Sequence, residues 1–80
     1  MKAYQRVYEA LKSQIETAKY PTGTLLPPEP ELEKLFSVSR TTIRKAVSML
    51  AEEGYVYVKQ GKGTSVLYGS PLNPSTNSTT

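Results

Sequence analysis

The sequence predicts a mostly α-helical domain with a small β-hairpin, an α+β arrangement of three helices followed by two short strands. Two observations carry this prediction. Before residue 54, apolar residues recur at steps of three and four in three segments, which is the period of amphipathic helices. After Gly54 the period becomes two, and β-branched and aromatic residues dominate, which is typical of strands. With 80 residues, the chain is expected to form one domain, over residues 1–69.

The first helix is predicted over about residues 4–19. Its expected buried stripe consists of Tyr4, Val7, Tyr8, Leu11, Ile15 and Ala18. Pro21 and Gly23 follow closely, and this pair of residues interrupts helices. The second helix is predicted over about 28–36. Proline suits its first turn, where the missing N–H would have no partner, and acidic residues suit the positive end of the helix dipole. Leu32, Leu35 and Phe36 are expected to face inward.

The third helix is predicted over about residues 39–53, after a turn of only a few residues. Ser39 can cap it by accepting a hydrogen bond from the backbone N–H of Thr41 or Thr42. Its buried stripe is predicted to be Ile43, Ala46, Val47 and Leu50. Gly54 stands where a left-handed residue commonly ends a helix.

The strands are predicted at residues 55–58 and 64–68, joined by a tight hairpin in which Gly61 and Gly63 take positive φ. Two helices joined by a short turn, the second with a basic face, form a helix-turn-helix, and the basic hairpin makes it a winged one. Residues 70–80 are rich in Ser, Thr, Asn and Pro, which predicts a flexible linker or disordered tail.

The composition argues against an enzyme. The chain has no cysteine and no histidine, so it lacks the commonest metal ligands and the commonest general base at neutral pH. Glu29, Glu31 and Glu33 are spaced two apart, and helix residues at that spacing do not face each other. We therefore expect no catalytic site, no metal and no cofactor. The sequence also has no secretory signal and no long apolar run, so we expect a cytoplasmic protein without a membrane partner.

The positive charge is concentrated in the second half of the domain. Residues 1–36 carry five basic and five acidic side chains, whereas residues 37–69 carry five basic and two acidic ones. The whole net charge of +3 therefore lies in the later segment, as expected if one face meets a polyanion.

The outward face of the third helix is the strongest functional signal. Its residues are Arg40, Thr41, Arg44, Lys45 and Ser48. Two arginines one turn apart repel each other, and positive charge in the first turn opposes the helix dipole. A recognition helix tolerates both penalties, because its N-terminal residues contact base edges in the major groove. Arginine matches the two acceptors of guanine, and threonine can contact bases or phosphates.

The hairpin tip is a weaker signal. Gly61 allows close approach of the backbone, and Gln60 and Lys62 offer a donor and a charge for a minor groove or for phosphates. An ordinary hairpin with lysines for solubility would look the same. Two other functions stay open: a winged-helix module that binds an acidic protein, and RNA binding through the hairpin and the tyrosines.

Four blocks of sequence resemble the N-terminal domain of GntR-family transcriptional regulators. They occur in this order: Leu26-Pro27-Pro28-Glu29-Pro30-Glu31-Leu32, Val38-Ser39-Arg40-Thr41-Thr42-Ile43-Arg44-Lys45-Ala46, Leu50-Ala51-Glu52-Glu53-Gly54 and Gln60-Gly61-Lys62-Gly63-Thr64. The resemblance covers about residues 4–68, and the last block looks most like the HutC-type branch. It implies a bacterial regulator, expected to be a repressor, that binds an inverted-repeat operator as a homodimer.

The expected DNA-contacting residues are Ser39, Arg40, Thr41, Thr42, Arg44, Lys45, Gln60, Gly61 and Lys62. By the family pattern, the three hydroxyl residues anchor the recognition helix, about 39–53, on phosphates. The two arginines read bases in the major groove, with guanine as the target. The wing, about 59–63, lies at the minor groove, with Lys62 on the backbone.

Three positions depart from the family pattern. Pro30 stands where the family usually has a DNA-contacting arginine, which removes one contact per protomer. Ser37 replaces a common glycine in the turn, and Glu33 replaces a small residue. Family members continue into a C-terminal domain that binds a small effector and dimerises. This chain therefore reads as the DNA-binding half of a longer regulator, and we expect it to be monomeric away from DNA.

Overall fold

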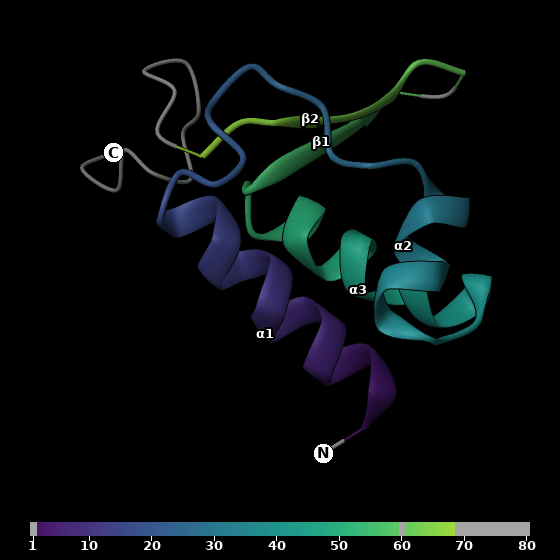
Figure 1. The fold of residues 1–80 in the computed structure, drawn as a ribbon. Coiled ribbons are helices and arrows are strands. Elements are labelled where there is room, and N and C mark those ends of the chain that lie inside the picture. The colour runs from purple at the N-terminus through teal and green to yellow at the C-terminus, as the bar shows by residue number, and fades with distance from the viewer. Residues whose placement is uncertain (1, 60, 69–80) are drawn as a thin grey trace.

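The computed structural model describes residues 2–59 and 61–68. In chain order its elements are α1 (Ala3–Glu16), α2 (Glu29–Phe36), α3 (Arg40–Glu52), β1 (Val56–Lys59) and β2 (Gly63–Val66). The predicted fold class is confirmed, since three helices are followed by a two-stranded antiparallel sheet (Figure 1). The predicted tail, residues 70–80, lies outside the described residues, as does the domain boundary at residue 69.

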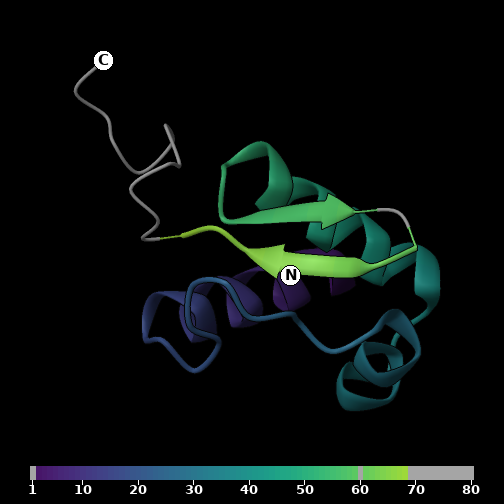
Figure 2. The ribbon, with the colours of Figure 1, turned by 90° about the horizontal axis from the view of Figure 1, so that it is seen from above.

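Helix α3 is the central element of the fold. It packs against α1 on one side, α2 on another and β1 on a third. In Figure 1, α1 lies below α3 and the two strands lie above it. Seen from above in Figure 2, the strands run side by side over the helices. Because α3 contacts each neighbour, its outward residues are held by the whole domain rather than by one partner.

The core is a single apolar cluster contributed by every element. Its buried members are Val7, Tyr8, Leu11, Ile15, Leu26, Leu32, Ile43, Ala46, Val47, Leu50, Val56 and Val66. The predicted stripe of α3 is confirmed in full, and four of the six residues predicted for α1 are buried. A helix stripe of period 3.6 and strand residues of period two therefore meet in one core, as amphipathic elements require.

The first helix is shorter than predicted. It ends at Glu16, and Ala18, which was expected in its buried stripe, is exposed with φ 65°. The backbone N–H of Thr17 still donates to Ser13 O at 2.9 Å, and that of Ala18 donates to Ile15 O at 3.1 Å. The left-handed residue turns the chain back before Pro21 is reached, so the helix stops earlier than the proline–glycine signal predicts.

The prediction that Leu35 faces inward is wrong. Leu35 is 62 % exposed, whereas Leu32 is buried and Phe36 is half-buried. Helix α2 has only eight residues and contacts α3 along one side. Leu32 and Phe36 are one turn apart and share the side that faces α3, so α3 covers them and leaves Leu35 outside.

The sheet has a third, unpredicted participant. The strands pair from Val56↔Val66 to Lys59↔Gly63. On the free edge of β2, Leu25 forms an isolated bridge with Ser65, and the Leu26 N–H donates to Thr64 O at 2.9 Å. The segment after α1 therefore covers this edge, which buries Leu26 and satisfies backbone groups that an open edge would expose.

The turn between α2 and α3 is closed by local hydrogen bonds. Ser37 has φ 56°, in the left-handed region, and the Val38 N–H donates to Glu33 O at 3.2 Å. The Ser39 side chain accepts from the Thr42 N–H at 3.3 Å, which confirms the predicted cap. Gly54 has φ 82° after α3, also as predicted. Within the described residues, no helix is long and apolar enough to cross a membrane.

Candidate nucleic-acid interface

The start of α3 presents its polar residues to solvent. Arg40, Thr41, Arg44 and Lys45 are exposed, and Thr42 is half-buried. The side chain of Arg40 is 58 % exposed and that of Arg44 is 63 % exposed. Since the buried stripe of α3 fixes the rotation of the helix, both guanidinium groups are held on the outside of the packed body.

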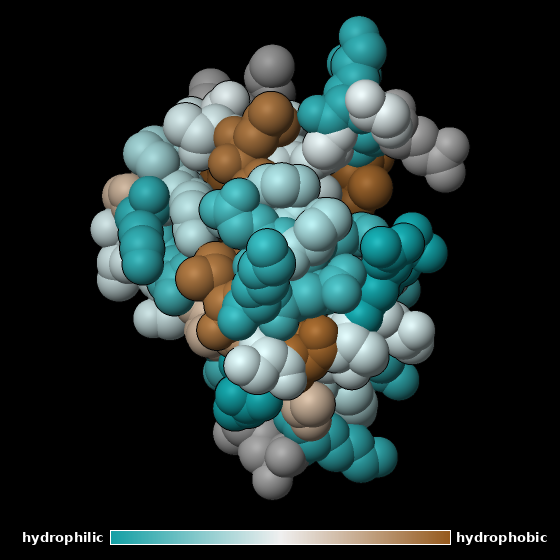
Figure 3. Space-filling model, turned by 45° about the vertical axis from the view of Figure 1, so that its right-hand side comes forward, coloured by the Kyte–Doolittle hydropathy of each residue, from teal (hydrophilic) through white to brown (hydrophobic). Residues whose placement is uncertain are grey.

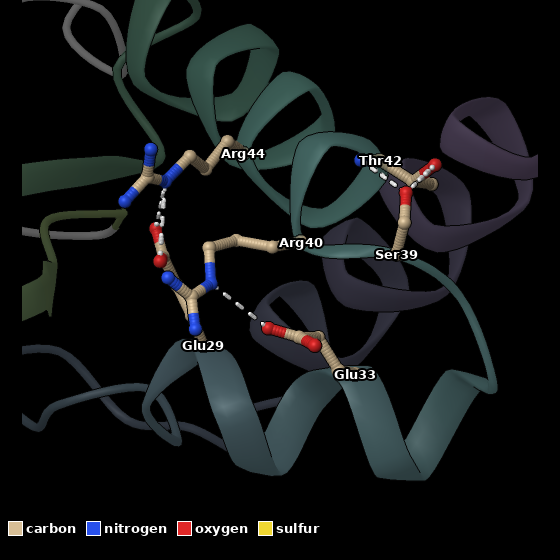
Figure 4. A network of polar contacts seen from close by, with 6 residues as sticks. All are labelled: Glu29, Glu33, Ser39, Arg40, Thr42 and Arg44. Carbon is tan, nitrogen blue, oxygen red and sulfur yellow. Dashed lines mark hydrogen bonds and ion pairs between the residues drawn. The ribbon is translucent and has the colours of Figure 1, made fainter.

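Both arginines lean toward α2, where each meets a carboxylate (Figure 4). Arg40 Nε lies 3.3 Å from Glu33 Oε2. Arg44 Nε lies 3.1 Å from Glu29 Oε2 and 3.2 Å from Glu29 Oε1. The two pairs offset the repulsion between the arginines and their clash with the helix dipole, which are the penalties inferred from the sequence.

The hairpin tip is exposed and tightly turned. Gly61 has φ 77° and Gly63 has φ 106°, which confirms the predicted positive φ values. The Lys62 N–H donates to Lys59 O at 2.9 Å and closes the turn. A Cβ on Gly61 would meet nothing within 4 Å, so the requirement for glycine there is conformational rather than steric. Gln60, the remaining predicted contact, lies outside the described residues.

The arginine face and the hairpin tip lie on the same side of the molecule. In Figures 1 and 2, the start of α3, α2 and the turn between the strands all lie to the right. Arg44, Lys59, Gly61 and Lys62 line one groove, which Glu29 also lines. Figure 3 brings this side forward and shows it mostly hydrophilic, with separate apolar patches.

Lys45 is also exposed but is engaged by the first helix. Its Nζ lies 4.4 Å from the centre of the Tyr4 ring, a cation–π contact between α3 and α1. The predicted contact residues of α3 therefore divide into two sets. The arginines lie toward α2 and the groove, whereas Lys45 lies toward the start of α1.

A second polar cluster links α1, the C-terminal end of α3 and the hairpin. The Tyr8 hydroxyl donates to Glu53 Oε1 at 2.5 Å, and the Tyr55 hydroxyl donates to Glu16 Oε2 at 2.6 Å. Lys12 Nζ lies 5.5 Å from the centre of the Tyr8 ring and 5.6 Å from that of Tyr55. Burial, followed by the hydrogen bond to the carboxylate, raises the pKa of both tyrosines. The hydrogen bond to Tyr8 raises the pKa of Lys12.

The contacts of Tyr8 and Tyr55 indicate that these tyrosines are packing residues. Tyr8 is buried, and the Tyr55 ring stacks on Tyr68 with centres 4.7 Å apart. Both residues therefore pack within the domain, whereas Tyr57 is 53 % exposed. A row of free aromatic faces, which single-stranded nucleic acid would need for stacking, is not formed by Tyr8 and Tyr55.

Sequence reasoning missed the role of the two glutamates of α2 and the position of the Lys45 ammonium. From the sequence, Glu29 and Glu33 were assigned to the helix dipole and excluded as a catalytic or metal site, and no pairing with the arginines was predicted. Their arginine partners are 15 and 7 residues away, on another helix, so the rule for pairs within one helix cannot find them. The usable signal was the short turn, which brings the start of α3 back beside α2.

Comparison with known sequences finds relatives among transcription regulators. A family model described as "Bacterial regulatory proteins, gntR family" matches residues 3–66. The HTH-type transcriptional regulator TreR of Bacillus subtilis is 41 % identical over 61 residues, which cover 76 % of this chain and 26 % of that protein. The Exu regulon transcriptional regulator of Escherichia coli is 41 % identical over 68 residues, or 85 % of this chain and 26 % of that protein.

Solved structures of transcription regulators also resemble this fold. The DNA-binding domain of AraR in complex with operator ORE1 superimposes with a TM-score of 0.81 and 41 % identity, over 82 % of this chain and 80 % of that one. A GntR family transcriptional regulator from Listeria monocytogenes has a TM-score of 0.79 and 27 % identity, over 84 % and 59 % of the two chains. The chain matches only about a quarter of the length of its curated relatives. The family match over residues 3–66 shows that this chain belongs to the gntR family of bacterial regulatory proteins.

Proposed function

We propose that this domain binds double-stranded DNA in a sequence-specific manner, as the DNA-binding part of a bacterial transcription regulator. The observation that carries the proposal is the common placement of two exposed arginines and a glycine-containing basic hairpin tip on one side of the molecule. The AraR domain, 41 % identical, is described in complex with an operator, which supports this assignment.

The proposed recognition element is the start of α3, inserted in the major groove. Arg40 and Arg44 would read base edges, with guanine as the expected target, because a guanidinium can donate twice to O6 and N7. Ser39, Thr41 and Thr42 would contact phosphates, which fixes the register of the helix without reading sequence. Lys45 would add charge at the edge of this contact, beside Tyr4.

The wing is the second proposed contact. Gly61 and Gln60 would lie at the minor groove, and Lys62 would meet the phosphate backbone. Arg44 and Lys62 line the same groove, which supports a placement in which a duplex seated on the start of α3 would pass the hairpin tip. Pro30, exposed in α2, offers no N–H donor at the position where the family pattern usually has a DNA-contacting arginine, so each protomer would make one contact fewer.

The branch of the family, the direction of regulation, the oligomeric state and the effector are properties of the whole regulator. We infer that it is a repressor of the HutC-type branch, acting in the cytoplasm as a homodimer on an inverted repeat and controlled by a small effector bound to a further domain. The block Gln60-Gly61-Lys62-Gly63-Thr64 supports the branch. This domain alone is proposed to be monomeric without DNA. Dimerisation of the whole regulator would link two such domains and raise the effective concentration of the second domain at its half-site.

Selection from a library of duplexes with a randomised centre tests the proposal, because it reveals a preferred sequence and half-site spacing together. The salt dependence of binding to the selected duplex is the companion measurement. If two domains neutralise roughly 8 phosphates, the slope of log K against log salt should be near −7. Recovery of unrelated sequences, or tighter binding to single-stranded RNA than to any duplex, would contradict the proposal.

A further inference from the structure

The two ion pairs between α2 and α3 share one geometry. In each, a glutamate of α2 contacts the Nε of an arginine on the exposed face of α3. Glu33 is the more enclosed of the glutamates, with 28 % of its side chain exposed against 39 % for Glu29. The contact through Nε is important, because Nε and the two terminal NH₂ groups of a guanidinium have different roles in base recognition.

A guanidinium has one N–H on Nε and two NH₂ groups at its far end. Donation from Nε to a carboxylate fixes the rotation of the planar group about the end of the side chain. The two NH₂ groups then remain available as a fork, which matches the two acceptors on the major-groove edge of guanine. A carboxylate at Nε therefore does not compete for the fork and instead aims it.

The turn makes Glu33 a rigid support for Arg40. Ser37 is left-handed, Val38 N–H donates to Glu33 O, and Ser39 caps α3, so few backbone torsions are free between the two helices. Arg40 follows this turn directly as the first residue of α3. When a long side chain is held in place before DNA binds, less conformational entropy is lost on binding. This gain applies only to DNA sequences that fit the held position of the side chain.

The same carboxylate carries an electrostatic penalty. It lies on the side that would face phosphates, so it repels every duplex regardless of sequence. An exposed pair of this kind adds little to folding stability. Its effect should therefore appear in the balance between specific and non-specific DNA binding rather than in the stability of the domain.

We propose that Glu33 is a positioning residue that fixes the Arg40 fork for base discrimination and lowers the general affinity for DNA. This inference rests on the proposed function, since it assumes that Arg40 reads a base. Glu29 supports Arg44 by the same contact, and Glu33 is the better test because its partner follows the rigid turn.

The test compares the wild-type chain with Glu33→Gln and with the matched control Glu31→Gln. Glu31 lies on the same helix, is exposed, and forms no ion pair within the described residues. Both variants remove one negative charge, but only the first removes it from the acceptor of the Arg40 Nε–H, which leaves at most a weaker, neutral hydrogen bond there. Each protein is used to select from the same randomised duplex library, and its affinity is then measured for the wild-type-selected duplex and for random duplex.

We expect Glu33→Gln to bind random duplex about twofold to fivefold more tightly, because a charge beside the proposed phosphate contacts is gone. Only Glu33→Gln should weaken the preference at one base pair, by roughly threefold to tenfold, part of the roughly 5- to 150-fold that one bidentate contact provides. In an Arg40→Ala background, Glu33→Gln should have no further effect on base preference. Thermal unfolding of each variant confirms that the fold is retained.

Two results would overturn the inference. One is an unchanged base preference for Glu33→Gln, and the other is an equal loss of preference for Glu31→Gln. A gain in affinity for selected and random duplex alike would show that Glu33 only repels DNA. These failures differ from failure of the proposed function, in which the wild-type protein itself would select no consensus.

Discussion

Arg40 and Arg44 are placed against the electrostatics of their own helix and are compensated from the neighbouring one. Positive charge at a helix N-terminus is unfavourable, and the arginines are one turn apart. Glu33 and Glu29 of α2 supply the opposite charge. The pairs are exposed, so they contribute little to stability, and the arginines remain available to an outside partner.

The arginine and the wing lysine should differ in what they contribute to binding. Arg44→Ala is expected to cost about 1–3 kcal/mol on the selected duplex and to relax the preference at one base pair. Lys62→Ala should weaken all sequences alike and reduce the salt slope by about 1, since it removes a phosphate contact. Titrations of both variants against selected and random duplex at several salt concentrations measure this difference, and equal losses on both duplexes for Arg44→Ala would refute its role as a base reader.

Ser37 is a residue whose backbone strain can be relieved. A non-glycine residue in the left-handed region costs roughly 1–2 kcal/mol, and glycine does not. Part of that gain is lost to the greater entropy of an unfolded chain with glycine. Ser37→Gly is therefore expected to raise the free energy of unfolding by about 0.5 kcal/mol.

The matched control for Ser37→Gly is the same substitution at Ser48, which is exposed in α3. Glycine is a poorer helix former than serine, so Ser48→Gly should lower the free energy of unfolding by about 0.5 kcal/mol. Urea denaturation measures both. A loss of stability for Ser37→Gly comparable to that of Ser48→Gly would show that the left-handed conformation is not the determining feature.

At the scale of elements, the cap of α3 serves folding and binding together. The Ser39 side chain accepts from the Thr42 N–H, and Ser39 is also a proposed phosphate contact. Ser39→Ala should lower the free energy of unfolding by about 1 kcal/mol. Ser39→Asp should keep the cap and weaken duplex binding several-fold, because it places a negative charge beside phosphates.

Denaturation and duplex titration of the two Ser39 variants separate these effects. If Ser39→Asp loses as much stability as Ser39→Ala, the hydroxyl is not acting as the cap. If it binds duplex as tightly as the wild-type protein, the start of α3 does not approach phosphates.

The tyrosine cluster should make the domain sensitive to alkaline pH. Burial and a carboxylate acceptor raise the pKa of Tyr8 above 10.0 in the folded state. The pKa of Tyr55 is raised for the same reasons. A group that holds its proton more tightly when folded stabilises the fold fully below its unfolded pKa, and that contribution is lost as pH rises through the folded pKa.

The free energy of unfolding should therefore be steady up to about pH 9 and fall above about pH 10. Tyr8→Phe should make this fall shallower, and Glu53→Gln should do the same because it removes the negative charge that favours the protonated Tyr8 hydroxyl. Denaturation at a series of pH values measures the slope. Identical slopes for Tyr8→Phe and the wild-type protein would exclude Tyr8 as a source of the effect.

The sequence predicted elements well where their signal is local. The stripe of α3, the Ser39 cap and the turn glycines each depend on residues within one or two turns of chain, and all are confirmed. Leu35 and Ala18 were misplaced because burial depends on which neighbour an element meets. The bridge from Leu25 to Ser65 joins segments 40 residues apart in sequence, so no local sequence pattern predicts it.

The candidate site shows the same division. The exposure of Arg40 and Arg44 follows from the buried stripe of their helix, and it was predicted. Their glutamate partners were not, because the angle between α2 and α3 decides which side chains meet. Gln60 lies outside the described residues, so its role at the wing stays a prediction.

At the scale of the whole molecule, residues 2–59 and 61–68 form two polar assemblies. One is the side with the arginines, the hairpin tip and the groove between them. The other is the cluster of Lys12, Tyr8 and Tyr55, which ties α1 to the end of α3 and to the hairpin. The first leaves its charged groups exposed, and the second uses its groups to hold the elements together. Only the first is suited to a polyanionic partner.

The central claim is that duplex DNA is bound by the start of α3 and the wing together. The most direct measurement is a titration of isotope-labelled protein with the selected duplex, followed by backbone amide NMR shifts. We expect the largest shifts at residues 40–45 and at Gly61 and Lys62, with little change around Lys12 and Tyr55. Shifts that cluster around Lys12 and Tyr55, or that spare either α3 or the wing, would contradict the claim.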